Sequence, residues 1–270
     1  MKKKKYMLII SLLILAILAS SLLSLNLGGV ISISPMEVWN TIIGQGTKQQ
    51  ELVLFDFRLP GIVLALLIGM GLSVSGSVLQ SITQNELAEP GIIGINAGGA
   101  GFFIVLFIYF FQEVIPINSS LSIFSMPIFA LLGAFTAAVI IYLLSWRKGI
   151  NPIRLILVGI GGVNAGFGAA LIIFQLKMDP QDFRQVTVWL SGDIWNADWL
   201  FVYALLPWML VFIPFVIWKS NTLNVMTLTD SIASSLGARV EAERLWLLFA
   251  AVALAGASVA AGGEALPFLA

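Results

Sequence analysis

The chain contains no cysteine and no histidine among its 270 residues. Disulfides, thiolate nucleophiles and cysteine-ligated metals are therefore excluded, and the commonest general base and metal ligand is missing too. Charge is also scarce, because only 10% of the residues are charged, against about 25% in a typical soluble domain. The 14 basic and 14 acidic residues cancel, so no positive excess exists to bind nucleic acid. We expect no cofactor, no metal site and no covalent chemistry.

Long apolar runs make up most of what is present. Hydrophobic residues account for 59% of the chain, and crossing a bilayer takes about 20 consecutive apolar residues. Barrel strands would be shorter and would alternate in polarity. We therefore predict an all-α, polytopic membrane helix bundle forming one transmembrane domain over residues 1–270. The predicted spans are Tyr6–Leu27, Leu59–Asn85, Pro90–Gln112, Met126–Ser145, Leu155–Leu176, Trp199–Trp218 and Leu245–Gly263.

The distribution of Lys and Arg predicts a cytoplasmic N-terminus for this multi-pass protein of the cell membrane. Most basic residues then fall in inside loops, as the positive-inside rule requires. Lys2–Lys5 followed by an apolar run also fits a signal peptide. The run is longer than a usual signal core and lacks a clear small-residue cleavage site. We therefore predict a retained first span.

Four uncharged amides lie at or near the predicted membrane depth: Gln80, Gln84, Asn85 and Asn96. Amides in this position face either a partner helix or a water-filled cavity. The sequence leaves open whether they line a path or make interhelical hydrogen bonds. The nearby Glu89-Pro90-Gly91 predicts a break between two helices, with Pro90 beginning the second.

The most polar stretch of the chain, residues 219–244, lies in a predicted inside loop. Thr229 or Asp230 can cap a short helix that ends near Leu236, with Gly237 directly after its end. A second helix would begin near Val240 and continue into the last span. Because the stretch is long for a connection without structure, we predict a docking helix rather than a linker. Its predicted apolar stripe consists of Ile232, Ala233 and Leu236.

Several short motifs occur in a fixed order between about residues 55 and 262. They are Arg58-Leu59-Pro60-Gly61, Ser75-Gly76-Ser77-Val78-Leu79-Gln80, the ten residues from Asn85 to Gly94 (NELAEPGIIG), Leu155–Asn164 (LILVGIGGVN), Trp189-Leu190-Ser191-Gly192 and Ser235-Leu236-Gly237. In this order they resemble the FecCD/BtuC-like permeases. These are the membrane subunits of ABC importers for iron-siderophores, haem and cobalamin.

The resemblance implies a permease subunit that translocates an iron-siderophore-type complex by alternating access. A separate ATP-binding subunit would supply the energy, since the chain has no G-x-x-x-x-G-K-[ST] loop. An extracytoplasmic substrate-binding protein would deliver the complex, and a second permease subunit would complete the path. The resemblance also implies site residues. They are Arg58 for docking of the binding protein; Asp230, Ile232, Ala233, Ser235, Leu236 and Gly237 for ATPase coupling; and Gln80, Asn85, Pro90, Gly91, Gly94 and Asn96 for the translocation path or gate.

The sequence departs from the family pattern at three points. Gly61 stands where the family often has a second arginine, and Glu86 replaces the usual proline after Asn85. The family also continues beyond a seventh span, so we expect about seven of roughly ten spans here and a C-terminally incomplete domain.

Two other classes of protein are alternatives to an importer permease. The main alternative is a secondary transporter or channel, but ion-coupled carriers tend to place ionisable residues inside their spans. The predicted spans contain none. An intramembrane enzyme is a weaker alternative, because no paired catalytic site is evident.

Overall fold

The parts of the chain that the computed structural model describes are mostly helical. These are residues 2–27, 33–91, 94, 101–111, 120–145, 154, 157–180, 183–184, 186–187, 192, 197–228, 230–235 and 239–262. No strand occurs within these ranges, which confirms the all-α class. The chain divides into a smaller unit, Met1–Leu64 with Trp195–Trp199, and a larger unit, Ala65–Ile194 with Leu200–Ala270.

Apolar helices overlap each predicted span, in the predicted order. Five of them in the described residues are long and apolar enough to cross a bilayer: Lys4–Leu25, Lys48–Thr83, Ile123–Ser145, Trp199–Trp218 and Val240–Gly262. Phe102–Phe111 and Gly161–Gln175 are shorter. The predicted polytopic helix bundle is therefore confirmed.

The smaller unit contains the helix of the first predicted span and also shorter helices that were not predicted. It holds α1 (Lys2–Leu27), α2 (Pro35–Ile42), α3 (Lys48–Glu51) and the π-helix η1 (Leu52–Arg58). Two capping boxes begin α2 and α3: Ser34 pairs with Glu37, and Thr47 with Gln50. Ile33, Val38, Val53 and Leu54 form a small core, against which Leu25 packs.

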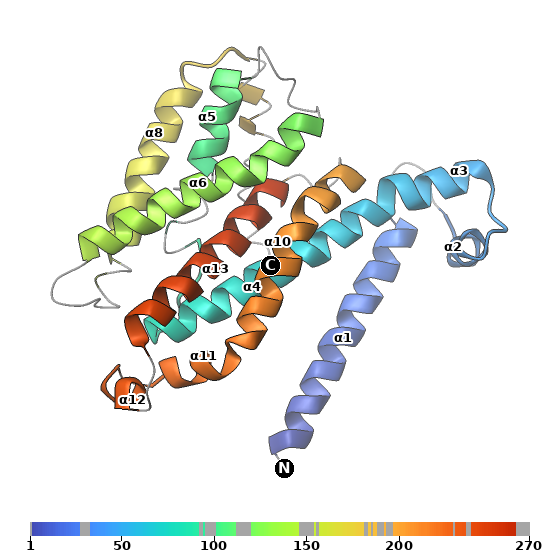
Figure 1. Cartoon of the computed structure of the whole chain (residues 1–270). Helices are drawn as coiled ribbons and strands as arrows, with labels where there is room; N and C mark the ends of the chain where they lie inside the picture. The colour runs from blue at the N-terminus through green and yellow to red at the C-terminus, as the bar shows by residue number, and fades with distance from the viewer. Residues whose placement is uncertain are drawn as a thin grey trace. The chain divides into compact units, whose positions relative to one another are not determined.

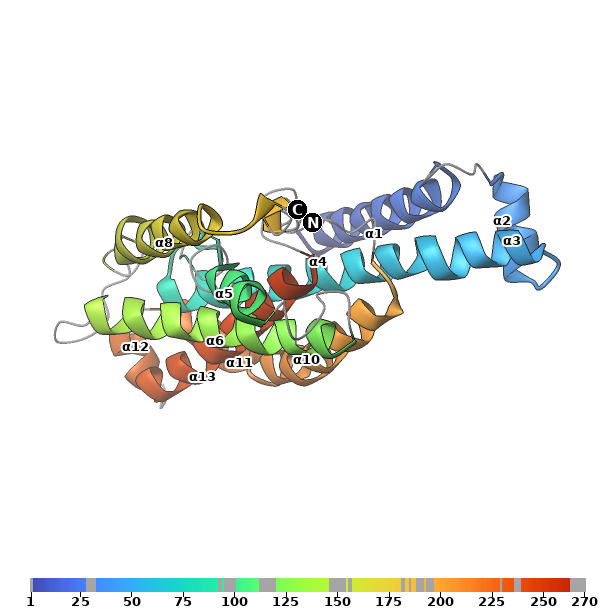
Figure 2. The same ribbon diagram turned by 90° about the horizontal axis from the view of Figure 1, so that it is seen from above.

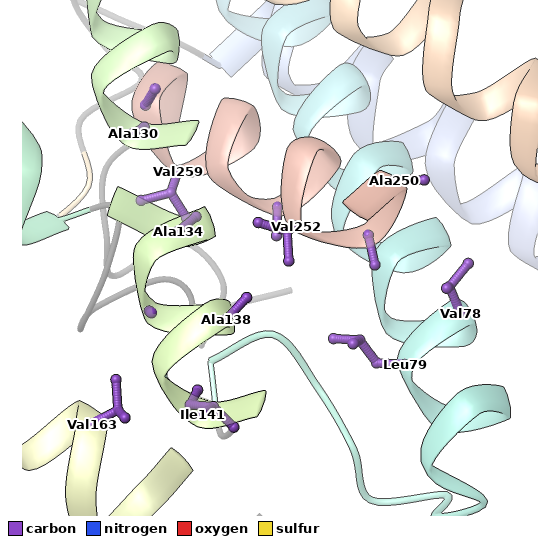
Figure 3. Close-up of a cluster of buried hydrophobic side chains, with 14 of the residues drawn as sticks. Val78, Leu79, Ala130, Ala134, Ala138, Ile141, Val163, Ala250, Val252 and Val259 are labelled. Carbon is purple, nitrogen blue, oxygen red and sulfur yellow. The ribbon is translucent and has the colours of Figure 1, made fainter. Parts of the chain in front are cut away.

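The core of the larger unit is built around α13 (Val240–Gly262), which lies between α6 (Ser120–Ser145) and α4 (Leu59–Thr83) (Figure 1). Every residue of α13 from Ala250 to Gly262 is buried. Small residues allow close approach: a Cβ on Gly256 would lie 3.3 Å from the Ala134 Cβ on α6. On the other side, the Ser75 hydroxyl of α4 donates to the Ala251 carbonyl at 2.7 Å. Figure 3 shows this shared core, to which the π-helix η3 (Gly159–Asn164) adds Val163.

Two shorter helices, α5 (Phe102–Phe111) and α8 (Ala165–Gln175), complete one side of the larger unit. Figure 2 shows α5 between α8 and α6. Aromatic rings make these contacts. The ring centroids of Phe102 of α5 and Phe167 of α8 are 5.3 Å apart, and those of Phe107 of α5 and Phe129 of α6 are 4.6 Å apart. Such pairs add packing energy beyond the area that they bury.

Three further helices follow: α10 (Trp199–Trp218), α11 (Ser220–Met226) and α12 (Asp230–Ser235). Helix α10 has the bounds predicted for the sixth span, although Pro207 and Pro214 lie inside it. Helix α13 begins at Val240, as predicted from the end of the polar loop.

Two predicted boundaries are wrong. Pro90 does not begin a helix: Pro90 and Gly91 lie in turns, and the helix of the predicted third span is α5, which starts at Phe102. The helix of the fourth span begins at Ser120 rather than Met126, with Pro127 inside it. Pro removes one helix hydrogen bond and its ring crowds the carbonyl four residues earlier, but in apolar spans neighbouring helices readily compensate for the lost bond.

Candidate functional site

The candidate path residues lie in a non-helical segment that follows α4. Helix α4 ends at Thr83, and the Asn85 amide then donates to the Gln80 carbonyl at 3.2 Å. The Asn85 side-chain oxygen accepts from the Leu87 amide at 3.0 Å, which forms a local Asx turn. Asn85 therefore shapes its own turn with the side-chain amide, and this contact is neither of the two alternatives that the sequence left open.

The same segment then enters the core of the larger unit. Ala88 is fully buried, and Pro90, Gly91 and Gly94 are buried as well. Non-helical backbone at membrane depth is tolerated only where protein or a water-filled cavity surrounds it. The buried, non-helical residues Ala88, Pro90, Gly91 and Gly94 meet that condition.

Gly94 joins this segment to η3. Its φ is +84°, and an added Cβ would lie 3.1 Å from the Gly159 carbonyl oxygen and 3.2 Å from the Asn164 Cβ. Both partners belong to the π-helix η3, and π-helical turns frequently occur at functional sites. The structure thus brings two of the predicted motifs, Asn85–Gly94 and Leu155–Asn164, into contact through one glycine.

The remaining path candidates are less informative. Gln80 is exposed near the end of α4. Asn96 lies outside the described residues.

The short helix predicted in the polar loop is present as α12, which begins at Asp230. It contacts α11 before it and α13 after it. The Lys219 ammonium lies 2.8 Å from the Glu243 carboxylate and connects the end of α10 to the first turn of α13. Both side chains are largely buried, with 19% and 23% exposed. This pair holds the base of the polar hairpin formed by α11 and α12.

The predicted apolar stripe of α12 is wrong for one residue. Ile232 is 49% exposed, but Ala233 is 1% exposed and belongs to the chain's own core. Successive residues on a helix point about 100° apart, so the two side chains serve different surfaces. Ser235 is exposed. Leu236 and Gly237 lie outside the described residues.

A connection between the polar hairpin and the non-helical segment was not predicted. The Gln84 side-chain amide donates to the backbone carbonyls of Met226, at 3.3 Å, and of Leu228. These two carbonyls lie at the C-terminal end of α11. Gln84 also has a positive φ of 52°, unlike any other non-glycine residue in the described ranges. The sequence signal was only an amide close to a helix end.

Arg58 lies in the smaller unit, at the end of η1. Its guanidinium donates to the Leu25 carbonyl and so ties α1 to η1. The side chain is half-buried. Arg58 therefore has a structural contact within the chain, whatever else it binds.

Metal-ligating side chains are not gathered anywhere in the described ranges. No group of three or more acidic, histidine or cysteine side chains could hold a metal ion there. The fold thus defines a class: a multi-pass, α-helical membrane protein with a buried non-helical segment and a structured polar hairpin.

Comparison with known proteins identifies the family. The model of the FecCD transport family matches residues 12–270, so the chain belongs to this family. It is 54% identical over 262 residues to the iron(3+)-hydroxamate import system permease protein FhuG of Bacillus subtilis, which covers 97% of this chain and 77% of that protein. It is 44% identical over 263 residues to the iron-uptake system permease protein FeuC of the same organism, covering 97% of this chain and 76% of the relative.

A solved structure agrees with this assignment. It is described as a metal-chelate type ABC transporter in an inward-facing conformation. The two chains superpose with a TM-score of 0.73 at 26% sequence identity, covering 94% of this chain and 76% of the other. The chain thus spans about three quarters of the length of the proteins that it matches.

Proposed function

We propose that this chain is the permease subunit of an ABC importer for a ferric siderophore, with a hydroxamate-type chelate as the first substrate to test. The observation that carries the proposal is the 54% identity, along 97% of the chain, to a permease of an iron(3+)-hydroxamate import system. A separate ATPase powers the import, an external binding protein delivers the chelate, and a second permease subunit completes the path. The N-terminus is cytoplasmic.

The buried non-helical segment supports a gate role for residues 84–91 and 94. Transporters commonly bind and gate their substrates where helices are interrupted, because the freed backbone groups can rearrange. Pro90, Gly91 and Gly94 limit side-chain bulk there, and Gly94 contacts η3 closely. Gln80, Asn85 and Asn96 supply the uncharged amides of this path.

The exposed face of α12 is the proposed ATPase contact. Ile232 and Ser235 point away from the core, with Asp230 at the start of the helix. Leu236 and Gly237 extend the contact in sequence. The hairpin that carries α12 is closed at its base by the Lys219–Glu243 pair, so it can transmit a push without opening there. Ala233 anchors the helix to the chain's own core.

Arg58 is the proposed contact for the external binding protein. Its guanidinium keeps partial exposure while bonding to Leu25, so it can also meet a carboxylate. Exposed ion pairs contribute roughly 0.2–1 kcal/mol each. One arginine, with Gly61 in place of a second, favours weak docking.

Uptake of ⁵⁵Fe-labelled ferric hydroxamate tests the proposal. Cells that lack their own hydroxamate permease would express this chain with candidate ATPase and binding-protein genes. We expect uptake that requires all three proteins and stops when the ATPase carries an inactive nucleotide site. Uptake that persists without the ATPase but collapses with the proton gradient would instead support the alternative, a secondary transporter or channel.

A further inference from the structure

We propose that Gln84 is a positioning residue that links the polar hairpin to the gate segment: its amide holds the end of α11 against the end of α4. The inference rests on the proposed function, because it assigns to one side chain the step between ATPase contact and gate. It arises from a backbone geometry that the sequence does not favour.

The backbone of Gln84 occupies a position normally reserved for glycine. Helix α4 ends at Thr83, and the Asn85 amide donates to the Gln80 carbonyl, which is the six-to-one bond of a Schellman motif. Gln84 is the residue in the left-handed conformation of that motif, with φ +52°. Glycine fits there without steric cost, while a side chain with a Cβ is penalised. A glutamine at this position implies that its side chain does something that glycine cannot.

The side chain satisfies the open end of another helix. The last carbonyls of any helix lack partners within it. Helix α11 ends at Met226, and the Gln84 amide donates to the carbonyls of Met226 and Leu228. The two contacts span 142 and 144 positions of sequence. One planar NH₂ group, with two donors, is matched to two acceptors.

The location of this link gives it a role in transmission. On one side, α11 contacts α12, which carries the proposed ATPase contact at Ile232. On the other side, Gln84 is followed by the Asn85 turn and then by the buried residues Ala88, Pro90 and Gly91. A displacement of α12 would therefore reach the gate segment through a path of bonded groups. Gln84 itself is exposed, so its side-chain amide can bond to water when the link breaks.

Three variants in the assembled transporter separate the side chain from the backbone. Gln84→Gly removes the amide but favours the left-handed conformation, so its thermal stability should equal or exceed that of the parent. Gln84→Glu keeps the length, but at neutral pH its carboxylate cannot donate to carbonyls. Gln175→Glu, at the end of α8, is the matched control for adding one carboxylate at a helix end.

The measurement is chelate uptake per ATP hydrolysed in proteoliposomes, at equal amounts of inserted complex. Losing two hydrogen bonds from the transmitting state should lower this ratio about tenfold in both Gln84 variants, with basal ATPase activity and co-purification retained. Gln175→Glu should match the parent. A stability loss alone would lower the amount of complex but not the ratio.

Two outcomes would overturn the inference. Parental ratios in both Gln84 variants would show that the amide transmits nothing. A reduced ratio in Gln84→Glu with a parental ratio in Gln84→Gly would show that the added charge, and not the lost donor, is responsible. If the parent complex itself neither binds an ATPase nor imports the chelate, the proposed function fails instead.

Discussion

Individual residues in this fold are constrained by backbone conformation more than by polarity. Gly94 combines a φ of +84° with van der Waals contact to η3. We expect Gly94→Ala to destabilise the protein by about 1–2 kcal/mol, the cost of a left-handed L-residue. The close approach of the added Cβ to the Gly159 carbonyl oxygen should destabilise it further. Thermal unfolding in detergent measures this. Gly76→Ala is the control: it lies inside helix α4 with nothing within 4 Å of its Cβ position, so alanine should be neutral or stabilising there. Equal destabilisation by both would contradict the account.

The sequence pointed to Asn85 and Gly94 but not to how they act. Asn85 was a candidate for the path because amides are costly in a membrane, and its side chain proved to bond its own turn. Gln84 is another amide near the predicted membrane depth, yet its hydrogen-bond partners Met226 and Leu228 are more than 140 positions away in the sequence. Local pattern cannot specify such a pairing, because it depends on how the helices pack.

At the scale of helices, α12 divides its side chains between an exposed face and the chain's own core. We expect Ile232→Asp to abolish ATPase co-purification while leaving the amount of inserted protein unchanged, because the side chain is 49% exposed. Ala233→Asp, one residue along, should instead reduce the amount of folded protein by burying an unpaired charge. Quantitative blotting of membranes and of the purified complex gives both readouts. Normal ATPase association with Ile232→Asp would rule out this face as the contact.

Helix α2 carries a pH-dependent cap. The Ser34 backbone N–H donates to the Glu37 carboxylate at 2.7 Å, and this bond lowers the pKa of Glu37 below its ordinary value. A carboxyl whose pKa is lower in the folded state stabilises the fold above its unfolded pKa, and loses that contribution as pH falls through the folded value. We expect the amide-exchange protection of α2 to decrease over that acidic range. Glu37→Gln, which keeps an acceptor without titrating, should flatten the dependence; parallel loss in both would show that the cap is not responsible.

Helix boundaries were predictable where composition changes sharply and not where proline or glycine has two uses. Trp199–Trp218 was correct because charged residues, Asp198 and Lys219, flank it closely. Pro90 was misread because proline fits both the first turn of a helix and a buried loop. The capping boxes at Ser34 and Thr47 were readable signals for α2 and α3, but hydropathy alone passes over such short helices.

For the whole molecule, the orientation in the membrane follows from charge and from helix length. Helix α10 has 20 residues, which at about 1.5 Å per residue matches the hydrocarbon core. We therefore expect the two ends of α10 to lie on opposite sides of the membrane. The membrane would then separate the α8–α10 connection from the α11–α12 hairpin. Figure 1 places the end of α8 and helix α12 at opposite ends of the larger unit. The excess of Lys and Arg predicts that α12 lies on the cytoplasmic side.

Because the chain has no native cysteine, single cysteines can test this orientation directly. Lys177 follows α8 and Arg239 precedes α13, and both side chains are exposed. We expect an impermeant maleimide to label Lys177→Cys in intact cells and Arg239→Cys only after the membrane is permeabilised. Labelling of Arg239→Cys but not Lys177→Cys in intact cells would invert the topology. That result would place α12, with Ile232 and the Gln84 link, on the side that no cytoplasmic ATPase reaches.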